Sequence, residues 1–174
     1  MITQHQQEQL MREAIHEAKR GEREGEAPIG CVLAVLQDGQ VDIVARGHNQ
    51  MNRLHCRVAH AEIRAFENAT NTSVPAVDLD AEGSILVSTL EPCVMCMGAA
   101  IEAGVKYVVF GLSSPADSGT QRVQETVFSP ESSQPIVFGN VLERECRKLF
   151  ADWLPQAKNP SQVLFVSQLL ALTS

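Results

Sequence analysis

The sequence contains no apolar run that approaches the roughly 20 residues needed by a membrane-spanning helix. Its first six residues have neither the basic start nor the apolar core of a secretory signal. Lys and Arg number 14 against 21 Asp and Glu, a net charge of -7, so there is no basic surplus to match the phosphates of a folded RNA. These absences predict a cytoplasmic protein without a membrane partner and disfavour RNA as its ligand.

The remaining composition is that of a globular protein. Hydrophobic residues make up 44% and charged residues 20%, values typical of a packed core with a solvated surface. A chain of 174 residues is long enough for one well-buried domain and too short to presume two, so we expect one domain over residues 1–174. The five cysteines are an odd number and include a C-x-x-C pair, which favours metal binding over a disulfide framework.

Hydrophobic periodicity predicts an α/β fold in which helices alternate with strands. A first helix over residues 3–20 begins with a capping box of Thr3 and Gln6 and stops at Gly21. Strands are expected over residues 31–36, 41–47, 84–90, 105–111 and 135–138, and further helices over 60–69, 93–103 and 141–153. An Asp38-Gly39 hairpin turn joins the first two strands. The third and fourth strands should be parallel because a helix joins them.

The apolar C-terminal extension, residues 160–174, has no clear periodicity. Its composition predicts burial, either on the chain's own sheet or on a partner subunit. The pattern leaves open whether this segment is a helix or a strand.

Two short stretches together offer an imidazole, two thiols and a carboxylate: Ala59-His60-Ala61-Glu62 and Glu91-Pro92-Cys93-Val94-Met95-Cys96. Proline is favoured at a helix start, which places both cysteines in one first turn and on one face. A helix N-terminus also favours the thiolate that binds zinc. We therefore expect Zn²⁺ held by His60, Cys93 and Cys96, with the fourth position left open as in catalytic sites.

The alternative is a structural zinc that closes its fourth position with Cys56 or His55. We disfavour it because a structural site needs neither Glu62 nor a helix start at Pro92. The other cysteines, Cys31 and Cys146, are expected to be small buried hydrophobic residues.

The pairing of His-x-Glu with Pro-Cys-x-x-Cys is the signature of the zinc nucleobase deaminases. The chain resembles the cytidine deaminase superfamily, and within it the branch of tRNA adenosine deaminases and guanine deaminases. Flanking stretches that share the resemblance are Ala27-Pro28-Ile29-Gly30, Gly47-His48-Asn49, Gly98-Ala99 and Val108-Val109-Phe110-Gly111. The resemblance implies a three-layer α-β-α fold, a five-stranded mixed sheet between helices, and a homodimer or larger homo-oligomer.

The same resemblance implies substrate contacts. Asn49 would bond the ring, the backbone of Ala61 would meet the base edge, and Ile29 would line the pocket. Asp117 lies in a polar loop, residues 112–134, that is typical of a lid or specificity loop; it is a candidate substrate contact, and the alternative is a solvated loop carboxylate. His48 and His55 are expected at the surface or behind the site.

This chemistry predicts a hydrolytic deaminase. Zinc lowers the pKa of a bound water toward about 7, and Glu62 is within reach to carry the proton to the ring nitrogen and the leaving amine. Hydroxide would attack the amine-bearing ring carbon and ammonia would leave. We expect an aminated nucleobase or nucleoside as substrate, purine-like rather than pyrimidine.

Two alternatives remain open. A tRNA-specific adenosine deaminase is favoured by the motifs and opposed by the acidic charge. The chain also has Cys56-Arg57-Val58 where the tRNA enzymes generally have Asp-Pro-Thr, Ala116-Asp117-Ser118-Gly119 where they have Lys-Thr-Gly-Ala, and an apolar end in place of a basic helix. The other alternative is a non-catalytic zinc module that scaffolds a complex.

Overall fold

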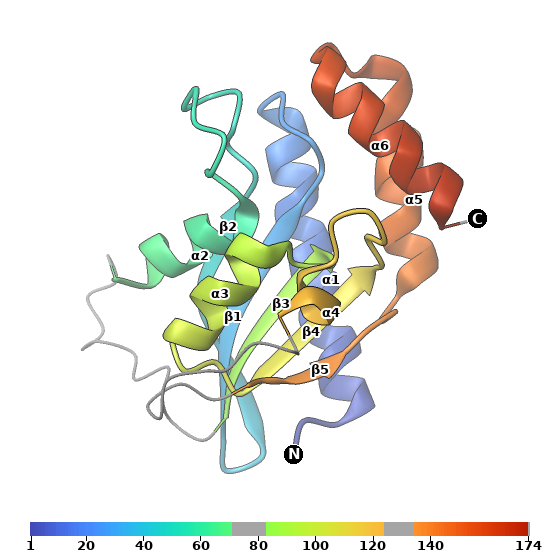
Figure 1. Cartoon of the computed structure of the whole chain (residues 1–174). Helices are drawn as coiled ribbons and strands as arrows, with labels where there is room; N and C mark the ends of the chain where they lie inside the picture. The colour runs from blue at the N-terminus through green and yellow to red at the C-terminus, as the bar shows by residue number, and fades with distance from the viewer. Residues whose placement is uncertain (71–82, 124–133, 174) are drawn as a thin grey trace.

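A five-stranded mixed sheet forms the centre of the molecule (Figure 1). The computed structural model describes residues 1–70, 83–123 and 134–173. The strands are β1 (Gly30–Gln37), β2 (Gln40–His48), β3 (Ser84–Leu90), β4 (Tyr107–Leu112) and β5 (Ile136–Phe138), in the spatial order β2-β1-β3-β4-β5. β1 is antiparallel to β2 and to β3, whereas β4 is parallel to β3 and to β5. The expected mixed sheet and the parallel pairing of β3 with β4 are confirmed.

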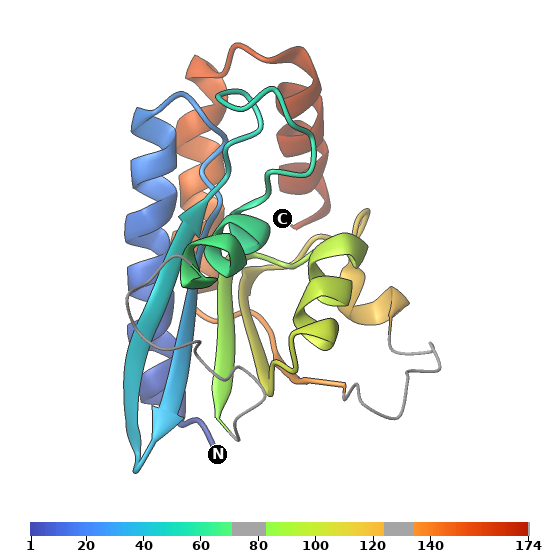
Figure 2. The same ribbon diagram turned by 90° about the vertical axis from the view of Figure 1, so that its left-hand side faces the viewer.

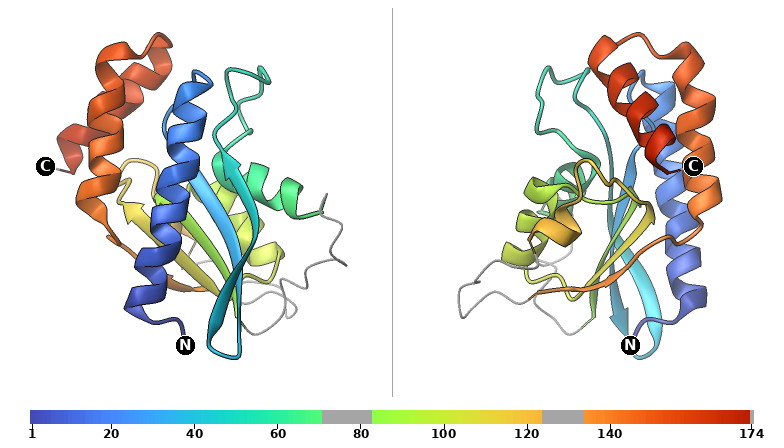
Figure 3. Two further views of the ribbon diagram at one scale, coloured as in Figure 1. Left: turned by 180° about the vertical axis from the view of Figure 1, so that it is seen from behind. Right: turned by 45° about the vertical axis from the view of Figure 1, so that its right-hand side comes forward.

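Helices cover both faces of the sheet (Figure 2). They are α1 (Gln4–Arg23), α2 (Ala61–Thr70), α3 (Val94–Glu102), α4 (Gly119–Arg122), α5 (Glu143–Trp153) and α6 (Pro160–Leu172), with a 3₁₀ turn η1 (Leu154–Gln156). α1 and α5 lie side by side on one face (Figure 3), and α2 and α3 pack on the other. Each face has its own hydrophobic cluster. The three-layer α-β-α arrangement is therefore confirmed, and no helix of the described residues could span a membrane.

Local sequence signals explain most element boundaries. The capping box is present: Thr3 Oγ1 accepts from the Gln6 backbone N at 3.3 Å, and Gln6 Oε1 accepts from the Thr3 backbone N at 2.9 Å. Asp38 and Gly39 both have positive φ, 51° and 79°, as a two-residue hairpin turn requires. The expected stop at Gly21 is wrong, because Gly21 lies inside α1, where the absence of a side chain accommodates the ring of His48.

Other boundaries shift by a few residues. β4 begins at Tyr107 rather than residue 105, and α3 ends at Glu102, followed by Gly104 with φ of 69°. α5 begins at Glu143 rather than residue 141 because Leu142 adopts a left-handed conformation with φ of 52°. Residues 71–82 and 124–133 lie outside the described residues, and the second of these ranges belongs to the expected loop over residues 112–134.

The C-terminal extension is a helix that packs on its own chain. Asn159 caps α6, accepting from the Ser161 backbone N at 3.1 Å, and Pro160 opens its first turn. Val166 and Leu169 are buried in the cluster formed with α1 and α5. α6 lies beside α5 and joins the hydrophobic cluster on that face of the chain's own sheet, so the segment left open between helix and strand is a helix.

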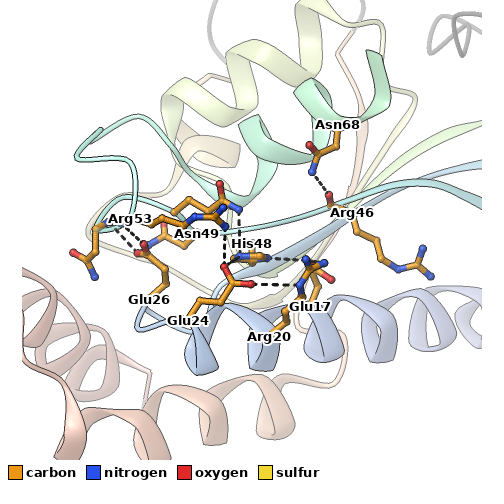
Figure 4. Close-up of polar contacts among 11 residues, drawn as sticks. Glu17, Arg20, Glu24, Glu26, Arg46, His48, Asn49, Arg53 and Asn68 are labelled. Atoms are coloured by element: carbon orange, nitrogen blue, oxygen red, sulfur yellow. Dashed lines mark hydrogen bonds and ion pairs between the residues drawn. The ribbon is translucent and has the colours of Figure 1, made fainter. Parts of the chain in front are cut away.

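His48 is buried, with 2% of its surface exposed, and does not line the cavity, so of the two expected positions it takes the one behind the site. Its Nδ1 lies 2.8 Å from Glu17 Oε1, and its Nε2 lies 3.2 Å from Glu24 Oε2 (Figure 4). The bond to Glu17 is the main cause that raises the pKa of His48, and the same bond lowers the pKa of Glu17. The contact between Glu17 and His48 holds α1 against the end of β2.

α2 lies directly on β2 at Gly47. A Cβ atom added to Gly47 would come within 2.4 Å of the Ala61 carbonyl oxygen and of the Ala65 backbone nitrogen. No side chain fits between these two backbones. The absence of a side chain at Gly47 therefore sets where the first turn of α2 lies.

We expect Gly47→Ala to lower the free energy of unfolding by about 1–3 kcal/mol, because the added methyl group forces α2 away from β2. Urea denaturation of the zinc-loaded protein would measure this. Gly98→Ala in α3, where an added Cβ meets nothing within 4 Å, is the matched control and should leave stability unchanged or raise it by up to about 1 kcal/mol. Equal destabilisation by both changes would contradict the close approach.

The His48 network predicts a pH-dependent stability. Because the pKa of His48 is raised in the folded protein, its contribution to stability is fully present below the unfolded pKa of 6.5 and is lost as the pH rises through the folded pKa. Because the pKa of Glu17 is lowered in the folded protein, its contribution is present above the unfolded pKa of 4.5 and is lost as the pH falls through the folded pKa. The groups that face His48 are Glu17, Glu24 and Gln50, with Arg20 and Arg53 behind the carboxylates.

His48→Gln should therefore destabilise the protein by about 1–3 kcal/mol between pH 4.5 and 6.5, and by less at a pH of about 8.5. Denaturation of wild type and variant at both pH values gives the difference. A loss that is independent of pH would show that His48 acts only by packing.

Candidate metal centre and its cavity

His60, Cys93 and Cys96 converge from two helix starts on the same face of the sheet. His60 directly precedes α2, Cys93 is the N-cap of α3, and Cys96 lies in the first turn of α3. The His60 Nδ1 atom lies 3.7 Å from Cys93 Sγ and 3.6 Å from Cys96 Sγ, and the two sulfurs are 3.6 Å apart. The three predicted ligands therefore form one compact group of donor atoms.

This triangle fits a tetrahedral zinc ion. Zinc bonds of about 2.3 Å to sulfur and 2.0–2.1 Å to nitrogen imply tetrahedral edges of about 3.8 Å between sulfurs and about 3.6 Å between sulfur and nitrogen. The observed separations lie within a few tenths of an ångström of these values. Among the described residues, the group contains three His, Cys, Asp or Glu donors and includes neither His55 nor Cys56. This arrangement matches an open, catalytic-type site.

The two thiols differ in acidity because they interact. The neighbouring Cys96 thiol is the main cause that lowers the pKa of Cys93 to about 4, helped by the His60 ring and the Cys96 backbone N–H against the effect of burial. The same contact, with burial and Glu62, raises the pKa of Cys96. The contact with Cys93 raises the pKa of His60. The chain thus holds one thiolate ready beside a second thiol, a donor set suited to zinc.

Glu62 is a buried carboxylate at the edge of this triangle, with 3% of its surface exposed. Its Oε1 accepts a 2.7 Å hydrogen bond from the Ser88 hydroxyl on β3, and its Oε2 accepts from the Cys96 thiol at 3.3 Å. One oxygen is therefore fixed by the sheet, and the other lies beside the three donors. The prediction that Glu62 lies next to the donor group agrees with this position.

A cavity of about 650 Å³ opens onto the donor group. That volume lies within the range of small-ligand sites. The sequence-predicted residues that line it are Ile29, Asn49, His60, Glu62, Cys93 and Asp117. Ala61 is fully buried and is not among the lining residues, although its neighbours are. His55 and Cys56 also line the cavity, and His55 is exposed there, which agrees with the expected surface position.

Asp117 is half-buried at the cavity, and its Oδ1 lies 3.7 Å from Arg122 Nη1. Burial is the main cause that raises its pKa, with the Cys93 charge adding to the effect. Asp117 lines the cavity while about half of its side chain, 49%, is exposed. Its role as a substrate contact therefore stays a prediction.

Glu91 was missed by the sequence reasoning. It is buried and its carboxylate accepts from the Ser114 backbone N at 2.8 Å and from the hydroxyls of Ser113, Ser118 and Thr120. Four donors from residues 113–120, the loop after β4 and the start of α4, thus converge on one carboxylate. Glu91 fixes the loop that carries Asp117 against the start of α3. A glutamate directly before the Pro-Cys motif was the available signal.

The helix α6 was also missed as part of the site. Its N-cap Asn159 and three of its residues, Ser161, Gln162 and Phe165, line the cavity. The Asn52 side chain bridges to it, donating to Gln162 Oε1 at 3.2 Å and accepting from Asn159 Nδ2 at 2.9 Å. The Asn159-Pro160 pair is a helix-start signal that could have identified this wall.

Comparisons with known proteins agree with this geometry. The pattern of the family described as cytidine and deoxycytidylate deaminase zinc-binding region matches residues 4–112. A tRNA-specific adenosine deaminase from Bacillus subtilis (strain 168) is 39% identical over 145 residues, which cover 81% of this chain and 84% of that protein.

Two solved structures are also similar. One comes from studies of A-to-I editing by tRNA:A34 deaminases at the wobble position of transfer RNA; it has 29% identity and a TM-score of 0.64, and the match covers 81% of this chain and 98% of that one. The other is a guanine deaminase from Bacillus subtilis, with 26% identity and a TM-score of 0.53. The match covers 74% of this chain and 82% of that one. Because the family pattern spans the donor group, the carboxylate and the sheet that supports them, the chain belongs to the cytidine and deoxycytidylate deaminase family, with its zinc-binding region.

Proposed function

We propose that this deaminase hydrolyses the amine of a nucleobase or nucleoside, with purine-like rings favoured. The observation that carries the proposal is the position of the Glu62 carboxylate, fixed by Ser88 and lying beside three zinc-type donors at the wall of a 650 Å³ cavity. A scaffold module would need the donors but neither the carboxylate nor the cavity.

The residues have distinct roles in this proposal. His60, Cys93 and Cys96 hold the metal, and zinc bound there supplies Lewis-acid activation of water at neutral pH. Glu62 Oε2 would take one proton from the attacking water and give it to the ring nitrogen, and would then move the remaining proton of the added hydroxyl to the amine, which leaves as ammonia while the ring carbon becomes a carbonyl. Ser88 holds the other carboxylate oxygen, so the proton-carrying oxygen keeps its place. Asn49, Ile29 and Asp117, which line the cavity, contact the ring. A contact with the Ala61 backbone stays a prediction, because Ala61 is not among the lining residues.

The charge of the cavity supports a neutral heterocycle over a polyanion. Arg57 is the single Lys or Arg among the described residues that line the cavity, against the acidic Glu62, Glu91 and Asp117. The other polar side chains there are mostly amides and hydroxyls. Such groups bond a base edge well and give little attraction to phosphates. α6 further walls the cavity from one side.

A tRNA adenosine deaminase is the second candidate, favoured by the 39% identical relative that bears that name. Both candidates share the metal, the carboxylate and the reaction and differ in the size of the substrate. The expected homodimer, cytoplasmic location and single domain stay predictions.

Ammonia release from a substrate panel separates the candidates. We expect the zinc-loaded protein to deaminate at least one of guanine, adenine, cytosine or their nucleosides with a higher kcat/KM than it shows for adenosine in tRNA. Glu62→Gln should lower kcat by about 10²–10⁴-fold with zinc content unchanged, because the proton carrier is lost.

The matched control is Glu67→Gln, a half-exposed position on the same helix that should keep wild-type turnover. A kcat/KM for adenosine in tRNA that is higher than the kcat/KM for every small substrate in the panel would favour the second candidate. Full activity in a zinc-loaded Glu62→Gln protein would refute the assigned proton carrier.

The wall formed by α6 gives a second test. Phe165→Ala should raise KM for the preferred small substrate by about tenfold, because its ring is part of the cavity wall. Leu164→Ala changes a neighbouring side chain that is 61% exposed and should leave KM unaltered. Equal KM values in both variants would show that α6 does not contact the substrate.

A further inference from the structure

Glu26 is a second buried carboxylate near the cavity, with no surface exposed. It lies between α1 and β1 and accepts three hydrogen bonds: from Asn49 Nδ2 at 3.3 Å, the Asn52 backbone N at 3.1 Å and the Arg53 backbone N at 2.7 Å (Figure 4). Burying a carboxylate is costly unless donors surround it in this way. Glu26 neither belongs to the metal donors nor lines the cavity, so its burial has another role.

The contact with Glu26 determines which end of the Asn49 amide faces the cavity. An ionised carboxylate only accepts hydrogen bonds, whereas an amide has a donating NH₂ end and an accepting oxygen. The NH₂ end of Asn49 therefore faces Glu26, and the oxygen points elsewhere. Among the described residues no donor bonds Asn49 Oδ1, while the side chain, 1% exposed, lines the cavity.

The backbone of Asn49 is fixed as well. Its N–H donates to the Ile29 carbonyl oxygen at 3.0 Å, which ties it to the start of β1. With the backbone held on one side and the NH₂ end on the other, a rotation of the amide would place its oxygen against the Glu26 oxygens. That arrangement is repulsive, so a single orientation is favoured.

We propose that Glu26 is a positioning residue that makes Asn49 a hydrogen-bond acceptor toward the ligand, so that the site prefers rings that present an N–H donor to Asn49. This inference rests on the proposed function, because it needs Asn49 to contact the substrate ring. It goes beyond that function by stating that Asn49 accepts, rather than donates, the hydrogen bond to the ligand, and that Glu26 determines this. The ligand class is a heterocycle with an N–H at the edge that meets Asn49.

Glu26 also holds the loop that follows β2. The backbone N–H groups of Asn52 and Arg53 donate to its carboxylate. The side-chain Nδ2 of Asn52 donates to the Gly25 carbonyl oxygen at 3.1 Å and to Gln162 Oε1 in α6. Removing Glu26 will therefore loosen a wall of the cavity as well as Asn49. A useful measurement must separate general loosening from a change in polarity.

Ligands that differ by one N–H make this separation. Hypoxanthine and uracil carry no amine to be hydrolysed, and each has N-methyl derivatives that remove one N–H at a time. Dissociation constants of these probes, measured by calorimetry with the zinc-loaded protein, give a methylation penalty for each N–H. We expect one methylated probe to bind wild type at least about tenfold more weakly than its parent, the loss of one hydrogen bond plus contact.

In Glu26→Ala, water that can both donate and accept replaces the carboxylate, and Asn49 is free to turn. The penalty for that probe should fall by at least about threefold relative to wild type, while the ratios for the other probes stay the same. Glu26→Gln keeps an oxygen for Asn49 and should restore most of the penalty. Glu17→Ala removes a buried carboxylate that contacts His48 rather than Asn49 and should keep the full penalty.

A uniform weakening of all probes in Glu26→Ala, with ratios unchanged, would overturn the proposal and leave a purely structural role. If Glu26→Ala does not keep its fold by circular dichroism, Glu26→Asp replaces it, with the same reduction expected because the shorter side chain draws back from Asn49. The proposed function fails separately, through absent turnover on the substrate panel. Failure of every probe to bind wild type would overturn the proposal about Asn49, whereas the proposed function is judged by turnover alone.

Discussion

Buried carboxylates, each enclosed by hydrogen-bond donors, determine the shape of the cavity. Glu26 accepts from the loop after β2, Glu91 from the loop after β4, and Glu62 from Ser88 on β3 and from Cys96. A buried charge without partners costs several kcal/mol, so each of these loops is stabilised in the conformation that brings its donors to the carboxylate. The walls are therefore set by hydrogen bonds directed inward from the loops.

The metal donors depend on a different constraint, the packing of two helices on one face of the sheet. Gly47 brings α2 close to β2, and the parallel pairing of β3 with β4 fixes the crossover that contains α3. The starts of α2 and α3 then meet at the ends of the strands, the place where α/β sheets bind ligands. The backbone dipoles of both helix starts favour negative charge there, which suits a thiolate and a metal-bound donor set. Fold and chemistry thus share one location.

How much of this could be predicted depends on how far apart in the sequence the interacting residues are. His60, Cys93, Cys96 and Glu62 were predicted from two short motifs together with the resemblance to the zinc deaminases, and the spacing of three residues between Cys93 and Cys96 places both thiols on one face of a helix start. The capping box of α1 and the Asp38-Gly39 turn were likewise local. Each rests on backbone geometry within a few residues.

The features that were missed are contacts between distant segments. The sequence left the position of His48 open because its two carboxylate partners come from α1 and its C-cap, 31 and 24 residues away. The amides that join Asn52 to α6 are more than 100 residues apart. Gly21 read as a helix stop because its role, making room for His48, exists only in the packed molecule. Local pattern reasoning has no access to these partners.

The enclosure of amides by carboxylates bears on how such a site discriminates between ligands. An amide by itself can turn and accept either polarity, so it distinguishes poorly between an N–H and a ring nitrogen. Specificity is a difference between two affinities, and it grows when the wrong ligand leaves a buried polar group unpaired. A carboxylate behind the amide creates that situation, because turning the amide would itself bring two acceptors together. The acidic character of this chain, which weighs against phosphate binding at the surface, is in the interior a means of fixing the polarity of a neutral site.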